Sequence, residues 1–135
     1  MIDSTKVLRA YLLATTLGPM VGTRIWGELN TPPPEYLPSQ GAAITFKSRG
    51  GPIDYTSAIL TTSWHFRIFG EDEYAARDVY LELVGVLHDH RGDGLLSALL
   101  EVQGQTLTDP DTRWPYILTF FQTQMYSGLT AMIPQ

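Results

Sequence analysis

The chain has 135 residues, of which 44% are hydrophobic and 17% charged, with a formal net charge of −5 and no cysteine. A chain of this length can fold as one domain over 1–135 and bury about two thirds of its extended surface. The lack of cysteine excludes disulfides and thiolate metal sites and suits a cytosolic origin. The acidic balance, with no basic stretch, argues against sequence-specific binding of nucleic acid.

Hydropathy gives two further expectations. No apolar run approaches the ~18 residues of a transmembrane helix, so we expect no membrane association. The N-terminal "MIDSTKVLRAYLL" lacks the basic head and small-residue cleavage site of a signal peptide.

The first elements are a helix, a short strand and a loop. Apolar spacing predicts a helix over 4–17 that Gly18 and Pro19 end. Residues 23–29 fit a short strand. The Pro-rich segment 30–41, "NTPPPEYLPSQG", cannot be regular structure because its four prolines remove backbone donors. It is therefore either a stiff extended crossing or a mobile loop. The face of the first helix should comprise Val7, Leu8, Tyr11, Leu12 and Thr15.

A long β-hairpin follows. Residues 42–48 and 56–69 flank "RGGPID" (49–54), which has the composition of a turn. Within 56–69 the even positions are mostly apolar and the odd positions mostly polar, which is typical of an antiparallel sheet exposed on one side. The core side of this strand should be formed by Leu60, Trp64, Phe66 and Ile68.

A second helix is predicted over 72–88. The acidic residues Glu71, Asp72 and Glu73 lie where the helix dipole is positive, and His88 lies where it is negative. We expect Val79, Leu83 and Leu87 to cover the apolar face of the hairpin. The whole buried stripe should be Ala76, Val79, Tyr80, Leu83, Val84 and Leu87.

The C-terminal part completes the sheet. Residues 95–104 fit a strand with Leu96, Ala98, Leu100 and Val102 on one face, with a short helix through "LLSALL" as the alternative. A Pro- and Asp-rich connection (106–115), a last long strand (116–127) and a C-terminal tail (128–135) follow. The predicted fold is α+β: a mostly antiparallel, twisted sheet of four to five strands with a long hairpin, packed against two main helices on one face.

Catalytic and metal-binding patterns are absent from the sequence. "HDHRGDG" (88–94) places His88 and His90 in a loop, where adjacent side chains diverge, and no second cluster of ligands accompanies them. There is no nucleophile elbow and no phosphate-binding loop. We therefore predict no catalytic residue, no cofactor and no metal, and no enzymatic activity.

Five residues are candidates for a protein–protein interface. Lys47, Arg49 and Asp54 lie in or beside the predicted hairpin tip, 47–54, whose alternative role is a solvated turn. Trp114 and Tyr116 lie at the entry to the last strand, where half-exposed aromatic rings suit either a protein contact or a simple clasp of the loop.

The order of elements resembles a family of phage proteins. "WHFRIFGEDEYAARDVYLELVGVL" resembles the central strand–helix unit of the tail terminator (tail completion) proteins of long-tailed bacteriophages, and "TDPDTRWPYILTFFQTQ" is similar to their last strand. "MIDSTKVLRAYLLATTLGPMVGTRIW" fits their leading helix and short strand. The resemblance covers about 3–126 and is carried by the order and spacing of elements.

The resemblance implies a structural virion protein without catalytic residues. Such a subunit would assemble as a homo-hexameric ring in the host cytoplasm, cap the tail tube at the head-proximal end of the tail, and join it to the head–tail connector or neck protein. DNA would pass through the ring without specific binding, which the net charge of −5 fits. The alternatives are a head-completion or neck protein of the connector, and a small-ligand-binding or enzyme domain that uses the polar face of the sheet.

Overall fold

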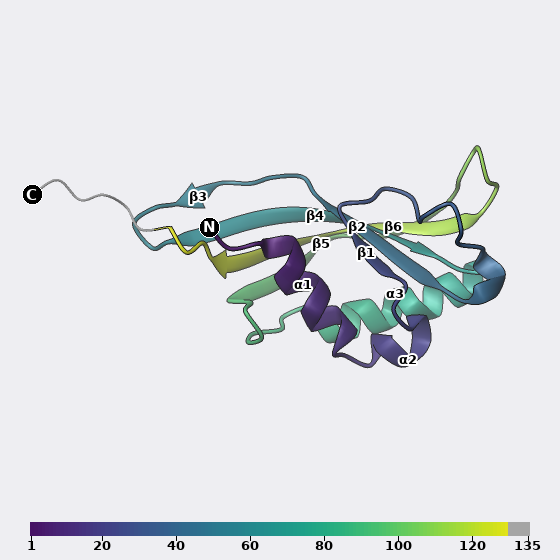
Figure 1. Cartoon of the computed structure of the whole chain (residues 1–135), viewed down its shortest axis with the longest axis horizontal. Coiled ribbons are helices and arrows are strands. Elements are labelled where there is room, and N and C mark those ends of the chain that lie inside the picture. The colour runs from purple at the N-terminus through teal and green to yellow at the C-terminus, as the bar shows by residue number, and fades with distance from the viewer. Residues whose placement is uncertain (130–135) are drawn as a thin grey trace, which may run out of the picture.

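The computed structural model describes residues 1–129, which form three α-helices and one six-stranded sheet (Figure 1). The helices are α1 (Ser4–Leu13), α2 (Leu17–Val21) and α3 (Glu73–Leu87), and a 3-10 turn spans Pro38–Gln40. The strands are β1 (Ile25–Gly27), β2 (Ala43–Ser48), β3 (Ile53–Asp54), β4 (Ile59–Phe69), β5 (Ser97–Thr108) and β6 (Pro115–Tyr126). Most of the predicted tail, from residue 130 onward, lies outside the described residues.

The sheet is mixed but mostly antiparallel. Its main path runs β1-β2-β4-β6-β5, and β3 pairs with β4 beside this path. Only β1 and β2 are parallel, because the Pro-rich segment returns the chain to the end from which β1 started, as a parallel pair requires. β4 and β6 pair along their whole length, from Ile59 opposite Tyr126 to Phe69 opposite Tyr116. The predicted fold class is confirmed.

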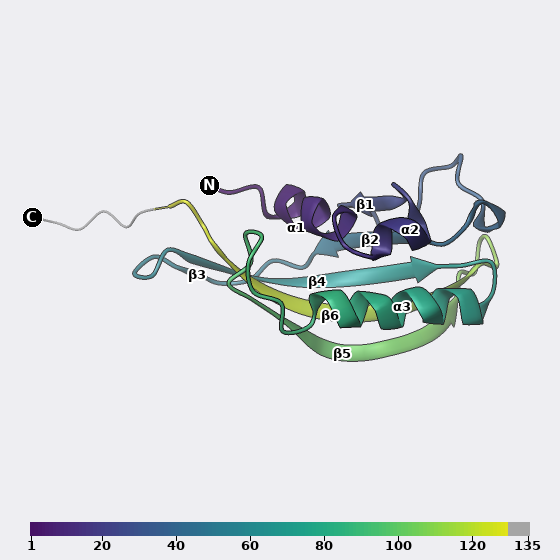
Figure 2. The same cartoon turned by 90° about the horizontal axis from the view of Figure 1, so that it is seen from below.

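All three helices cover the same face of the twisted sheet (Figures 1 and 2). The start of α3 is held by Asp72, whose side-chain Oδ1 accepts the Ala75 N–H at 2.8 Å. Its predicted buried stripe is confirmed, with Val84 only partly buried. Helix α3 therefore presents one apolar side to the sheet, as its periodicity predicted.

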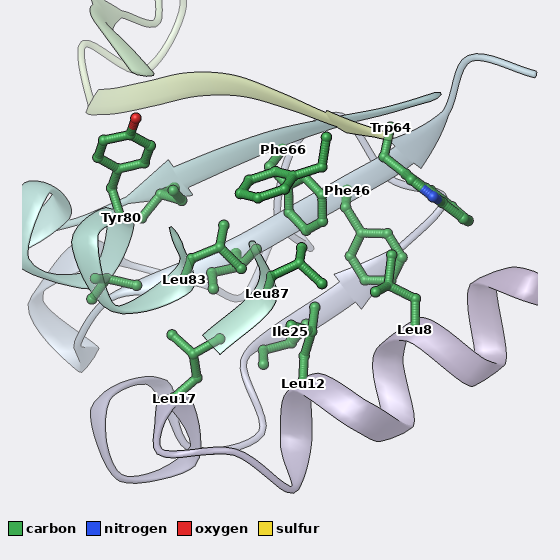
Figure 3. Close-up of a cluster of buried hydrophobic side chains, with 14 of the residues drawn as sticks. Leu8, Leu12, Leu17, Ile25, Phe46, Trp64, Phe66, Tyr80, Leu83 and Leu87 are labelled. Atoms are coloured by element: carbon green, nitrogen blue, oxygen red, sulfur yellow. The ribbon is translucent and has the colours of Figure 1, made fainter. Parts of the chain in front are cut away.

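The core lies between the helices and the helix-facing side of the sheet (Figure 3). Trp64, Phe66 and Ile68 are fully buried, as predicted. Phe46 packs edge-on against Trp64, with ring centroids 5.6 Å apart, and stacks on Phe66 at 5.5 Å. The Trp64 indole N–H donates to the buried Thr123 hydroxyl at 2.8 Å, so the one polar group of this ring is satisfied.

The prediction that Gly18 and Pro19 end the first helix is wrong. Helix α1 already ends at Leu13, and both residues lie in the first turn of α2. The chain turns at Thr15, whose hydroxyl donates to the Leu12 carbonyl and whose Oγ1 accepts the Leu17 N–H. Proline is tolerated in a first helical turn because the N–H that it lacks would have no partner within the helix.

The predicted turn at 49–54 is also wrong, and the hairpin is longer than expected. Backbone bonds from Arg49 N–H to the Ser63 carbonyl (2.7 Å) and from Thr61 N–H to the Pro52 carbonyl (3.1 Å) pair this segment with β4. The chain reverses at 55–58, where Asp54 Oδ1 accepts two backbone N–H groups. Gly51 permits the pairing, because a Cβ there would lie 1.9 Å from the Thr61 carbonyl oxygen.

This hairpin forms a projecting arm, defined here as 49–60. It extends beyond the helical layer at the end of the molecule where the N-terminus lies (Figures 1 and 2). Leu60, predicted to be core, is only partly buried because it lies in this arm. The side chain therefore has no helix above it.

Residues 95–104 contribute to a strand, and the helical alternative is wrong. Strand β5 extends to Thr108, so the predicted connection at 106–115 begins later than expected. Ala98 is buried as predicted, but Val102 is 50% exposed. A register shift between Leu100 and Val102 is the cause, because an inserted residue moves the following side chains to the opposite face.

Candidate functional site

The sheet face opposite the helices is only partly covered. Near the end of β4 it carries a second hydrophobic cluster of Tyr36, Ala43, Phe69 and Tyr116. The Pro-rich segment covers this cluster, and Tyr36 anchors it: its ring packs edge-on against Trp26 and Trp114, and its hydroxyl donates to the Gly41 carbonyl at 2.7 Å. Burial raises the pKa of Tyr36 to about 12, so the hydroxyl stays protonated. The segment is thus a packed crossing.

The uncovered part of this face carries a group of basic residues. We call Lys47, Arg49, His65 and Arg67 the cationic face. Lys47 lies opposite His65 across β2 and β4, and residues directly opposite share a face. His65 and Arg67 occupy odd positions of β4, on the side away from the core. The Arg49 guanidinium lies 4.7 Å from the centroid of the Phe120 ring, and Phe120 is opposite His65.

No acidic side chain among residues 1–129 forms an ion pair with the cationic face. Among residues 1–129 the one side-chain ion pair joins His90 to Asp93, far from this face in sequence. Lys47, Arg49 and Arg67 therefore form no ion pair within the described chain. The Arg67 guanidinium instead lies 5.3 Å from the Tyr116 ring centroid, a cation–π contact.

Two polar atoms of the cationic face are buried without a hydrogen-bond partner in the described chain. They are His65 Nε2 and Arg67 Nε. Burial, followed by the charges of Arg67, Lys47 and Arg49, lowers the pKa of His65, and only Glu28 acts in the opposite direction. An unsatisfied buried polar group costs free energy, so these two atoms make this part of the sheet locally unfavourable.

Apolar side chains surround the basic ones on the same face. Val102 lies opposite Phe120 and is 50% exposed, and Leu99 lies opposite Gln122 and is 44% exposed. Tyr126, at the base of the arm, is 63% exposed. A mixture of arginine, aromatic and aliphatic groups is typical of surfaces that contact other proteins.

The structure separates the five predicted interface residues into two groups. Lys47 and Arg49 are exposed and belong to the cationic face, whereas Asp54 holds the tip of the arm. Trp114 is half-buried and Tyr116 is buried, and both pack in the second hydrophobic cluster. This placement matches the loop-clasp alternative for the two rings, and a role of any of the five in an interface stays a prediction.

Sequence reasoning missed His65 and Arg67 as members of this surface. Both had been assigned to the polar side of the strand. The signal that unites them with Lys47 is the register of β2 against β4, which pairs Thr45 with Arg67 and Lys47 with His65. A sequence does not specify that register when the turn between the strands is misplaced.

His88 and His90 make separate contacts away from the cationic face. The Leu100 N–H donates to His88 Nδ1 at 3.0 Å. His90 Nε2 lies 2.9 Å from Asp93 Oδ2, and its ring stacks on Tyr11 with centroids 4.2 Å apart. Within 1–129 no three His, Cys, Asp or Glu side chains gather in a way that could hold a metal ion.

Both edge strands are partly blocked. The Arg9 side chain donates from Nε to the outward Ile25 carbonyl of β1 at 2.7 Å. On β5, the Ala98 carbonyl accepts the Asp89 N–H at 2.6 Å, and His88 occupies the Leu100 N–H. Since free edge groups are what a further strand would pair with, these contacts disfavour strand addition at those positions.

The surface also has open grooves. One, of about 580 Å³, lies between α1 and β1 and is lined by Asp3, Lys6, Arg9, Trp26 and Glu28 among others. A second, about 420 Å³, lies beside the Pro-rich segment, Asp109 and Trp114. Asp109 itself accepts backbone N–H groups of Asp111 and Thr112, which lower its pKa. Its carboxylate is thus used in shaping the loop. None of the helices within 1–129 is long and apolar enough to span a membrane.

Comparison with solved structures found a similar fold in a virus-like particle. The chain superposes with a TM-score of 0.60 on one chain of a structure described as the virion of a native gene transfer agent particle. The match covers 88% of this chain and 90% of the other, at 16% sequence identity. At this identity the likeness shows a shared fold. No protein-family model matches the sequence, and no curated protein matches it.

Proposed function

We propose that this chain is a structural virion protein, a tail terminator. Six copies would form a ring that caps the tail tube at its head-proximal end and joins it to the head–tail connector or neck protein, with DNA passing through the ring without specific binding. Assembly would take place in the host cytoplasm, and the protein would have no enzymatic activity and no cofactor.

The observation that carries the proposal is the fold shared with a chain of the gene transfer agent virion over nearly the full length of both chains. A match over 88% and 90% of the two chains leaves little of either outside the common fold. The order of elements in the sequence independently resembles that of tail terminators. Because one fold can serve several functions, the proposal depends on both observations together.

The surfaces fit a subunit of an assembly. A projecting arm and a cationic face that forms no ion pair within residues 1–129 are features that contacts between subunits can use. Two side chains of the kind that catalysis uses have structural contacts here: His88 accepts the Leu100 N–H, and the Asp109 carboxylate shapes a loop.

The test is the assembly state and the position in the particle. Size-exclusion chromatography with light scattering, across a range of protein concentrations, should detect a hexamer or a concentration-dependent ring. Negative-stain microscopy should show free rings of the purified protein and, when tail tubes are added, rings bound at the tube ends. A strict monomer that never binds tube ends would contradict the proposal.

The second candidate, a head-completion or neck protein, shares the virion assignment, because the similar structure is described only as a virion. Deleting the gene distinguishes the two. Loss of a terminator should produce tails of uncontrolled length, whereas loss of a neck protein should leave tails of normal length that do not join heads.

A further inference from the structure

The molecule carries opposite charges at two separate places. Lys47, Arg49 and His65 of the cationic face lie toward the arm, where Arg49 leads out of β2, and Arg67 lies further along β4. At the other end of the molecule β4 turns into α3, and there Glu71, Asp72 and Glu73 are all exposed (Figures 1 and 2). We call Glu71 and Glu73 the acidic corner, because Asp72 is already engaged as the helix cap.

The acidic corner also lacks partners within the described chain. Neither Glu71 nor Glu73 takes part in an ion pair among residues 1–129. Positive and negative side chains without ion pairs therefore lie on different surfaces of the same chain, whose net charge is −5. Exposed single charges contribute little to folding, and the acids at the start of α3 add only the modest stabilisation of a helix dipole.

We propose that the cationic face of one subunit receives the acidic corner of a second copy of this chain. The contact would pair Lys47 and Arg49 with the carboxylates of Glu71 and Glu73. The inference rests on the proposed ring function and specifies the surfaces that would build the ring.

The geometry favours this occupant in two ways. First, the two surfaces differ and lie apart on the subunit, so their contact is heterologous, and repeated head-to-tail contacts close into a ring when the rotation between copies allows it. Second, pairing of sheet edges is blocked at Ile25, Ala98 and Leu100, which disfavours strand addition at those positions. The exposed Leu99 and Val102 beside the cations add apolar area to the contact.

Nucleic acid is the competing occupant of a basic surface. Three Lys or Arg side chains form a small phosphate-binding site, and the rest of the chain is acidic, which opposes approach of DNA. A second copy supplies the complementary charge from the same sequence. DNA binding to this face is therefore one of the outcomes that would overturn the inference.

The first test reverses charges on each surface and then on both. Lys47→Glu/Arg49→Glu and Glu71→Lys/Glu73→Lys should each raise the concentration needed for half-assembly about tenfold or more, because like charges then face each other. The quadruple variant, which combines both pairs of substitutions, has the wild-type net charge of −5 and should regain assembly. Lys6→Glu/Arg91→Glu, at two exposed basic residues away from the cationic face, is the control with the same change of charge.

The second test uses the absence of cysteine in the natural chain. A single chain carrying Arg49→Cys and Glu73→Cys should form a ladder of disulfide-linked oligomers on mild oxidation, and each single variant should form no more than dimers. The ladder detects the contact even if rings dissociate on a column. Thermal melts of every variant verify folding. Melting near that of the wild type is expected because the changed residues are exposed, with a modest decrease for Glu71→Lys/Glu73→Lys, which places positive charge at the N-terminus of α3.

The outcomes separate this inference from the proposed function. Three results would overturn the inference and leave the ring function standing. The Lys47→Glu/Arg49→Glu variant could form rings normally, or the quadruple variant could fail to recover assembly. The wild type could also bind duplex DNA while the Lys47→Glu/Arg49→Glu variant does not. A wild-type chain that neither forms rings nor binds tube ends would overturn both.

Discussion

The burial of Trp64 predicts a large effect on stability. Its side chain is fully buried, packs against Phe46 and donates its indole N–H to Thr123. Trp64→Ala should cost about 3–5 kcal/mol through lost transfer free energy and the remaining cavity. For a domain with about 5–15 kcal/mol in total, we expect insoluble or largely unfolded protein.

The hydrogen bond can be separated from the packing. Thr123→Val keeps the shape of the side chain but leaves the buried indole N–H unpaired, which should cost about 1–3 kcal/mol. Trp64→Phe removes the N–H and part of the volume. Once the donor is gone, adding Thr123→Val should cost about 1 kcal/mol less than it does in the wild type, since no N–H remains to be left unpaired.

Urea unfolding followed by circular dichroism gives these free energies for the wild type, both single variants and the double variant. Circular dichroism avoids the signals of the other two tryptophans, Trp26 and Trp114. Soluble Trp64→Ala protein that unfolds cooperatively near the wild-type midpoint would refute the core assignment. If the effects of Trp64→Phe and Thr123→Val on the free energy of unfolding are additive, the hydrogen bond does not contribute as proposed, and the core assignment is unaffected.

Three further predictions concern the helix cap, pH and metal. Asp72→Ala should lower the free energy of unfolding by about 1 kcal/mol by removing the cap of α3, and an unchanged urea midpoint would contradict this. The lowered pKa of His65 means that the unfolded chain binds a proton more readily, so stability should fall as pH drops below the ordinary value of 6.5, and His65→Gln should flatten this dependence. The charges that act on this ring belong to Arg67, Lys47, Arg49 and Glu28. Chelators should leave the melting temperature unchanged, and stoichiometric bound zinc in the purified protein would contradict the prediction of no metal site.

The elements with strong periodicity were predictable because their pattern alone identifies the buried side. The alternation in 59–69 and the stripe of α3 each define an apolar face, and the two faces pack together because each must be buried from water. The predicted core residues Trp64, Phe66, Leu83 and Leu87 are all fully buried. The acids before α3 likewise marked its start, because a cap and a helix dipole act within one turn.

Predictions from glycine, proline and short-range alternation were wrong where the surrounding structure decided the conformation. Gly18 and Pro19 suggested a helix end but begin α2, since a first helical turn accepts proline. Gly50, Gly51 and Pro52 suggested a turn, but pairing with β4 carries the chain on to Asp54. The bulge in β5 turned Val102 outward although the alternation placed it with Ala98.

The sequence by itself determined the α+β class, the two apolar faces and the lack of catalytic motifs, because these follow from residue types and short-range spacing. Only the tertiary structure decided which polar residues lie together. Lys47, Arg49, His65 and Arg67 form one surface through the register of β2 and β4, and the acids at the start of α3 lie at the other end of the molecule. Register and layer order depend on contacts between segments far apart in the chain, and a one-residue slip of β2 against β4 would move Lys47 to the face opposite His65 and Arg67.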